Sequence, residues 1–266
     1  MSPIRVALSG SGFLLPAHVG ALQAVADAGF TPVELAGTSG GSIVAILAAT
    51  EMPLDVMKQI ALTLDWSPMM SASLLNILRG KSLSSGARLL DFLTQITKGL
   101  EFRQMEVELK VMASNIGTKQ PFVFSKATTP DTPIALAARA SAAIPVIYEP
   151  VIMGNAILFD GGMVNNMPSD ILVRDGIPRI GVDLVSDESI MLPEEYSLLA
   201  AAPRFIDMLL ASSEAAHIAD GVESGVHVIP VRTGFASSLD RTMCLATRQR
   251  LFSVGYETTL LVLKTL

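Results

Sequence analysis

Residues 37–41 read Gly-Thr-Ser-Gly-Gly, which fits the pattern Gly-x-Ser-x-Gly of a nucleophile elbow. In such an elbow a serine stands on a sharp turn between a strand and a helix, and the glycines at both ends let the strand and the helix approach closely. We therefore expect Ser39 to attack an acyl carbonyl, which is the chemistry of hydrolases and acyl transferases.

The residues on either side of this turn fit the same interpretation. Residues 33–36 can form a short buried strand, and residues 42–50 are apolar enough for a buried helix. The N-terminus of that helix would direct unpaired N–H groups toward Ser39, where an oxyanion develops during acyl transfer. The alternative is a Gly-Ser turn that opens an ordinary helix, with Ser39 as its cap.

The length and hydrophobicity are those of a large α/β domain. No repeat or Pro/Ser-rich linker divides the 266 residues, so we expect a single domain over residues 1–266. Hydrophobic residues make up 50% of the chain, yet Gly, Pro or a charge interrupts each apolar run before the roughly 18 residues that a membrane span needs. The apolar start resembles a signal peptide, but residues 9–12 and His18 interrupt it, so we interpret it as folded sequence.

Charge and cysteine content narrow the class of partner. The net charge is −6 and Lys and Arg are not concentrated anywhere, so nucleic acid is not expected as a partner. The single cysteine, Cys244, excludes an intrachain disulfide and fits a reducing compartment such as the cytoplasm. The high apolar content favours a lipid-like or acyl substrate, with contact at a membrane surface as an option. We expect no cofactor and no metal, and the sequence leaves the oligomeric state open.

A second glycine-rich turn lies near the N-terminus. Residues 4–8 predict a strand, residues 9–12 (Ser-Gly-Ser-Gly) a loop, and a helix follows from Pro16 to residue 28. Such a loop presents backbone amides to an anion. A dinucleotide site would need a third glycine where Leu15 stands, so an oxyanion loop is favoured, and a plain strand-to-helix turn is the other alternative.

Strands and helices alternate along the chain. We expect further strands at residues 109–114, 121–124, 156–159, 179–184 and 226–230, and further helices at residues 54–64, 87–96, 134–143, 193–219 and 241–264. This alternation predicts a mainly parallel sheet with helices on both faces.

Two groups of apolar residues allow more than one interpretation. Residues 66–70 and 74–78 could form a lid or an interfacial surface, although core packing is the favoured interpretation. Farther along lie large apolar residues that could line an acyl pocket but are again expected in the core: Met191, Leu192, Phe205, Met208 and Leu209.

A serine nucleophile needs a base within hydrogen-bonding reach. His227 falls inside a predicted strand, His217 inside a predicted helix, and His18 beneath the first loop, so each is a poor candidate, although a Ser-Asp-His triad through Asp160 or Asp183 is conceivable. Asp160 follows a strand and precedes two glycines, which marks either a turn or a carboxylate in a cleft. Burial could raise its pKa enough for it to act as the base.

Taken together, these segments resemble the patatin-like phospholipase family of acyl hydrolases. The resemblance covers residues 6–185 and rests on four motifs in the family's order: residues 8–12 with 17–22, residues 36–42, residues 140–145 (Ala-Ser-Ala-Ala-Ile-Pro) and residues 159–168. It implies a three-layer α/β/α sandwich and a Ser-Asp dyad, with Ser39 as nucleophile and Asp160 as its partner. It also implies an oxyanion hole lined by the amides of the following residues: Gly10, Ser11, Gly12 and, by our inference, Gly40.

The first loop departs from this family's usual Gly-Gly-Gly-x-Arg/Lys-Gly. Ser11 replaces a glycine, Leu14 replaces the basic residue and Leu15 the last glycine. Backbone donors tolerate Ser11, but the loss of the cation predicts either a neutral, lipid-like acyl ester as substrate or a lower activity.

Three functions follow as hypotheses. The favoured one is a serine acyl hydrolase acting on lipid or phospholipid esters. The second is a catalytically impaired lipid-binding protein of the same fold. The third, acyl transfer from a carrier thioester, ranks last because Thr38 stands where such enzymes usually have a histidine.

Overall fold

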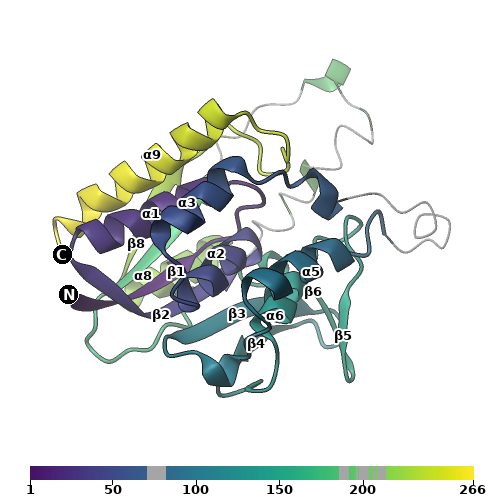
Figure 1. The fold of residues 1–266 in the computed structure, drawn as a ribbon, viewed down its shortest axis with the longest axis horizontal. Helices are drawn as coiled ribbons and strands as arrows, with labels where there is room; N and C mark the ends of the chain where they lie inside the picture. The colour runs from purple at the N-terminus through teal and green to yellow at the C-terminus, as the bar shows by residue number, and fades with distance from the viewer. Residues whose placement is uncertain (71–81, 186–191, 196, 198–203, 206–207, 209–213) are drawn as a thin grey trace.

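The protein is built on an eight-stranded mixed sheet with the strand order β5-β6-β3-β2-β1-β7-β8, and β4 pairs with β3 off this path (Figure 1). The computed structural model describes residues 1–70, 82–185, 192–195, 197, 204–205, 208 and 214–266. The strands are β1 (Ser2–Leu8), β2 (Phe30–Thr38), β3 (Glu108–Asn115), β4 (Gln120–Ser125), β5 (Val151–Met153), β6 (Ala156–Asp160), β7 (Arg179–Val185) and β8 (Val226–Arg232).

The central strands are parallel and one side of the sheet is antiparallel. Strands β3, β2, β1, β7 and β8 pair in parallel, whereas β4 and β6 run antiparallel to β3, and β5 runs antiparallel to β6. The predicted α/β class with a mainly parallel sheet is thus confirmed, and an antiparallel extension at one edge is added to it.

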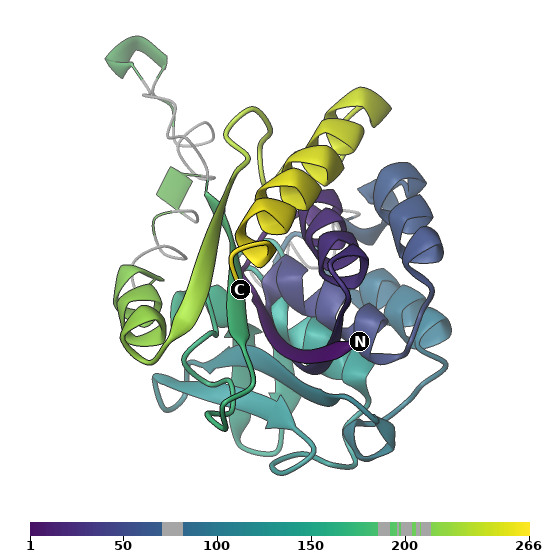
Figure 2. The same cartoon turned by 90° about the vertical axis from the view of Figure 1, so that its left-hand side faces the viewer.

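Helices cover the sheet on both faces. The α-helices are α1 (Leu15–Asp27), α2 (Ser39–Ala49), α3 (Leu54–Thr63), α5 (Ala87–Ile96), α6 (Ile134–Ser141), α8 (Glu214–Glu223) and α9 (Leu245–Leu263). Buried side chains of α1, α2, α3, α5, α6 and α9 join those of the strands in the main core. Helix α8 packs against β8 from the side opposite α9 (Figure 2). Within the described residues, no helix is both long and apolar enough to span a bilayer.

The two faces of the sheet take different side chains because neighbours along a strand point to opposite faces. In β1, Ile4, Val6 and Leu8 enter the main core. Ala7 instead faces the other side, where it packs with Ala36 and Leu172. Residues that follow β6 in the chain, among them Leu172, therefore cover part of the second face.

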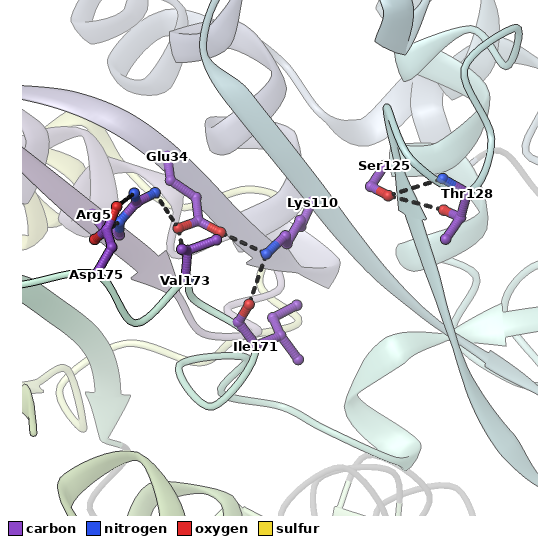
Figure 3. Close-up of polar contacts among 8 residues, drawn as sticks. All are labelled: Arg5, Glu34, Lys110, Ser125, Thr128, Ile171, Val173 and Asp175. Atoms are coloured by element: carbon purple, nitrogen blue, oxygen red, sulfur yellow. Dashed lines mark hydrogen bonds and ion pairs between the residues drawn. The ribbon is translucent and has the colours of Figure 1, made fainter. Parts of the chain in front are cut away.

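A buried ionic network fastens this covering segment to the sheet (Figure 3). Glu34 accepts hydrogen bonds from the Arg5 guanidinium at 2.7 Å and from the Val173 amide at 2.9 Å, and it pairs with the Lys110 ammonium at 2.7 Å. The ammonium also donates to the Ile171 carbonyl at 2.8 Å, and Arg5 pairs with Asp175. Side chains of β1, β2 and β3 thus hold residues 171–175 in position.

A separate contact in the same view closes the turn after β4 (Figure 3). The hydroxyls of Ser125 and Thr128 lie 2.9 Å apart, and the Thr128 amide donates to the Ser125 hydroxyl.

Most expected elements are present, with bounds that shift by a few residues. Strand β5 was not predicted, and of the helix expected at residues 193–219 the structure describes the 3₁₀ turn Pro193–Glu195 and helix α8. Residues 74–78, Met191 and Leu209 lie outside the described residues. The core role expected for the late apolar residues is wrong for three of them, because Leu192, Phe205 and Met208 are exposed.

Candidate active site

Ser39 stands at the junction of β2 and α2 with a φ of 51°. This left-handed conformation is uncommon for a residue with a side chain and is typical of a strained elbow. A Cβ added to Gly37 would lie 2.7 Å from the Gly41 carbonyl oxygen, and one added to Gly41 would lie 2.3 Å from the Ser9 carbonyl oxygen. Both glycines are therefore required by close backbone packing, as the sequence pattern predicted.

Asp160 is the last residue of β6. Strand β3 lies between β6 and β2, the strand that ends just before Ser39. Strand β3 pairs with β2 at Thr38 and with β6 at Asp160, which brings the two residues to one end of the sheet. The Ser39 hydroxyl donates to Asp160 Oδ2 at 2.7 Å, and both side chains are buried. The Gly162 amide donates to Asp160 Oδ1 at 2.9 Å, so the Asp-Gly-Gly sequence fixes the orientation of the carboxyl group.

Burial changes the proton affinity of this carboxyl group. Removal from water raises the pKa of Asp160 from 3.8 to about 7, because desolvation disfavours the charged form. The hydrogen bonds from Ser39 and Gly162 oppose the rise but do not cancel it. Asp160 can thus accept and release a proton near neutral pH.

No histidine of the described structure contacts Ser39. His18 lies in α1 beneath the first loop, where its Nε2 is 2.9 Å from the Ser9 carbonyl and burial lowers its pKa to about 4. His217, in α8, is bound to the Val164 carbonyl and pairs with Asp170. His227 is an exposed residue of β8. Among the described residues, Asp160 is the side chain that accepts a hydrogen bond from the Ser39 hydroxyl.

Three further serines support the pair, and none of them was assigned a role from the sequence. The Ser39 amide donates to the Ser141 hydroxyl at 2.8 Å, and the Ser42 hydroxyl donates to the Ser39 carbonyl at 2.6 Å. The Ser114 hydroxyl donates to the Asp160 carbonyl at 2.6 Å. Ser141 belongs to the motif at residues 140–145. The presence of this motif together with the elbow motif was the sequence signal that could have pointed to Ser141.

The first loop lies directly against the start of α2. A Cβ added to Gly40 would lie 2.3 Å from the Ser11 hydroxyl and 2.4 Å from the Gly12 carbonyl. Within the described structure the amides of Ser11 and Gly12 have no hydrogen-bond partner. The Gly10 amide differs, because it donates to the Asn166 carbonyl at 2.9 Å. Of the four expected oxyanion donors, this one is already engaged.

The two leucines that replace the usual residues of this loop are both buried in the main core. Leu15 also lines a pocket beside Ser39, whereas Leu14 does not. The remaining pocket wall is also predominantly apolar, with these residues in the lining: Gly12, Phe13, Gly40, Ile43, Trp66, Met69, Met70, Leu89, Ala142, Ile144 and Tyr148. Within the described structure this lining holds no charged side chain, and the described residues contain no cluster of three metal-ligating His, Cys, Asp or Glu side chains.

Sequence comparison finds a family and several relatives. A model of the family described as patatin-like phospholipase matches residues 6–173. The uncharacterized protein R571 of Acanthamoeba polyphaga mimivirus is 29% identical over 191 residues, which are 67% of this chain and 64% of that protein. The probable lipid hydrolase 463L of Invertebrate iridescent virus 6 is 36% identical over 94 residues, 35% of this chain and 32% of that protein. The matches to these two relatives thus span less than two thirds of each of them.

Solved structures share the fold. VipD from Legionella pneumophila superposes with a TM-score of 0.63 at 16% identity, covering 99% of this chain and 67% of VipD. The type III effector ExoU of Pseudomonas aeruginosa gives a TM-score of 0.55 at 17% identity, covering 99% of this chain and 53% of ExoU. Both likenesses concern the α/β architecture, a mixed central sheet flanked by helices.

Proposed function

The chain belongs to the patatin-like phospholipase family, and from this premise we propose that it hydrolyses carboxylic esters of lipids with Ser39 as nucleophile and Asp160 as base. The observation that carries the proposal is the 2.7 Å hydrogen bond from the Ser39 hydroxyl to a fully buried carboxyl group. Burial keeps the pKa of that group at about 7, within the range of an effective general base.

In the first half of the reaction, Ser39 Oγ attacks the ester carbonyl carbon and its proton passes to Asp160 Oδ2. The carbonyl oxygen becomes an oxyanion, which the amides of Ser11, Gly12 and Gly40 are available to stabilise. We do not assign this role to Gly10, because its amide donates to Asn166. The tetrahedral intermediate then expels the alcohol, which takes the proton from Asp160, and leaves an acyl group on Ser39.

In the second half, Asp160 accepts a proton from water as the water oxygen attacks the acyl carbonyl. The second tetrahedral intermediate expels Ser39 Oγ, which recovers the proton from Asp160, and a fatty acid is released. One dyad thus serves both steps, and every proton returns to its starting group.

The chemical class of the substrate follows from the pocket. An apolar lining that includes Phe13, Leu15 and Trp66 suits an acyl chain. Because Leu14 stands in the core where the family usually has a cation, the described residues supply no charge for an anionic head group at this loop. We therefore propose that neutral acyl esters are preferred over phospholipids.

A second candidate, a lipid-binding protein with impaired catalysis, rests on the same loop. Its Gly10 amide is engaged and its basic residue is replaced, so oxyanion stabilisation could fall below what turnover requires. Acyl transfer stays the weakest alternative, because Thr38 precedes the nucleophile and its hydroxyl is committed to the Asn165 carbonyl at 2.9 Å.

A fluorophosphonate probe tests the proposal. We expect the wild-type protein to be labelled, Ser39→Ala to lose all labelling, and Asp160→Asn to lose at least ~100-fold in rate, as expected when a general base is removed. Ser253→Ala removes an exposed hydroxyl on α9 and should label like the wild type. Unlabelled wild-type protein that still binds fatty acid would favour the second candidate.

A further inference from the structure

Three consecutive carbonyl groups, those of residues 164–166, each accept a hydrogen bond from a different part of the protein. The His217 side chain binds the first carbonyl at 2.9 Å from α8, the helix that packs against β8 (Figure 2). The hydroxyl of Thr38, the last residue of β2, donates to the second at 2.9 Å. The Gly10 amide of the first loop donates to the third at 2.9 Å. Residues 164–166, which we call the junction, thus connect the elbow, the first loop and α8.

The junction also closes the turn that orients Asp160. The Gly161 carbonyl accepts the amides of the first two junction residues at 3.1 and 2.9 Å. The next amide along the chain from Gly161, that of Gly162, donates to Asp160 Oδ1 at 2.9 Å. A displacement of the junction would therefore change how the Asp160 carboxyl group faces Ser39. A misplacement of about 1 Å between reacting groups costs as much as ~100-fold in rate.

The carboxylate of Asp170 holds the junction through two contacts. Asp170 Oδ1 accepts a hydrogen bond from the side-chain amide of Asn165, the second junction residue, at 2.8 Å. Asp170 Oδ2 lies 3.4 Å from His217 Nδ1, and the other ring nitrogen of His217 binds the Val164 carbonyl. Asn165 is buried, and Asp170 and His217 are partly buried. Since hydrogen bonds to an ionised group are stronger than neutral ones, Asp170 restrains the junction both directly and through the imidazole ring.

We propose that Asp170 and His217 are positioning residues for the reaction, because they hold the junction where it fixes the elbow and the first loop relative to Asp160. The proposal rests on the proposed function, since it concerns the same reaction. Neither Asp170 nor His217 lines the pocket, so they affect the geometry of the reacting groups and not the binding of substrate. His217 lies beyond residues 6–173, so part of this support comes from outside the family match.

Saturation kinetics of fluorophosphonate labelling separate positioning from binding. Asp170→Ala should lower the maximal labelling rate constant about tenfold and leave the half-saturating probe concentration unchanged, because it displaces reacting groups without altering the pocket. Asp170→Asn should retain more of the rate, since its amide oxygen still accepts from the Asn165 side chain. His217→Ala should also slow labelling. Combined with Asp170→Ala it should add little further loss, because both residues act through one junction.

Asp175→Asn is the matched control. Asp175 lies in the same stretch of chain after β6, and its carboxylate pairs with Arg5. Within the described structure no hydrogen bond joins its side chain to the junction. This variant therefore weakens an ion pair without releasing the junction, and it should be labelled like the wild type. An unchanged rate in Asp170→Ala, or an equal loss in Asp175→Asn, would overturn the positioning role.

Amide hydrogen exchange measures the restraint on the junction without any chemistry at Ser39. The Gly10 amide is bound to the last junction carbonyl, so its exchange should be about tenfold faster in Asp170→Ala and unchanged in Asp175→Asn. Unlabelled wild-type protein with this difference in exchange would reject the proposed function and leave Asp170 as the residue that holds the junction. Labelled wild-type protein with equal exchange in the two variants would reject the positioning role alone.

Discussion

Ser39 and Asp160 are 121 positions apart in the sequence, yet the Ser39 hydroxyl lies 2.7 Å from the Asp160 carboxyl group, and neither side chain contacts a histidine of the described structure. Among the described residues, the hydroxyl proton of Ser39 therefore has one side-chain acceptor within hydrogen-bonding distance. The proton affinity of that acceptor determines how the chemistry depends on pH.

The rate of fluorophosphonate labelling should rise with pH around a midpoint near 7. In the proposed mechanism the carboxylate form of Asp160 is the base, and burial raises its pKa to about 7, so the group is protonated and unable to act as a base below that pH. Labelling rates measured from pH 5 to 9 would check this. A midpoint near 4, or a flat profile, would contradict the assignment.

The change that Asp160→Asn makes in the free energy of unfolding should be more favourable at pH 8 than at pH 5. The folded protein keeps the Asp160 proton up to a pKa of about 7, whereas the unfolded chain releases it near 3.8. Between these values the wild type loses about 1.4 kcal/mol of unfolding free energy per pH unit, and asparagine does not titrate. Urea unfolding at both pH values measures the difference, which would be constant if Asp160 had an ordinary pKa.

Ser141→Ala should destabilise the protein by about 1–3 kcal/mol and slow labelling of Ser39, because the buried Ser39 amide loses its acceptor. Ser42→Ala is the contrasting variant, because the Ser39 carbonyl that loses this donor can still accept the amide of the next helical turn. We expect a smaller effect there. Chemical denaturation of both variants makes the comparison, and equal losses would argue against a specific role of Ser141.

Glu34→Gln should cost about 3–5 kcal/mol of stability, since it leaves the buried Arg5 and the partly buried Lys110 without their shared carboxylate. Glu101→Gln breaks a pair with the exposed Arg103 and should cost about 1 kcal/mol or less. Thermal unfolding of the two variants would test this difference in stability. Glu34→Gln should have the lower unfolding temperature.

Trp66→Ala should move the substrate preference toward longer acyl chains. Trp66 lines the pocket and is held between Phe13 at 6.0 Å and Phe92 at 5.9 Å, so its removal lengthens the apolar space. We expect the ratio of kcat/KM for dodecanoyl to butyryl esters to rise about tenfold. Phe102→Ala removes a buried ring that does not line the pocket and should leave the ratio as it was.

The parts of the site that the sequence could predict are those fixed by local pattern. The glycines at 37 and 41 identified the elbow because steric crowding leaves no room for a side chain there. Asp160 was identified by its glycine neighbours and by the family resemblance. Helix α2, however, begins at Ser39 and not at residue 42 as expected, because close packing overrides the low helix propensity of glycine.

The parts that could not be predicted depend on contacts between distant segments. The acceptor role of Ser141 and the engagement of Gly10 by Asn166 each join residues far apart in the sequence. Strand β5 has three residues, too few for an alternating pattern to be recognised. The buried network around Glu34 likewise forms only when three strands and a later loop come together.

The first loop is attached to its neighbours on three sides, and this has a bearing on inhibitor design. The Ser9 amide binds the Val182 carbonyl, the Gly10 amide binds that of Asn166, and the Phe13 amide binds that of Ser238. These bonds hold the backbone around Gly12 in place. The charged end of a transition-state mimic that binds there can therefore be varied only a little. Variation belongs at the other end of such a compound, where Met69 and Met70 have unbranched side chains that can change rotamer.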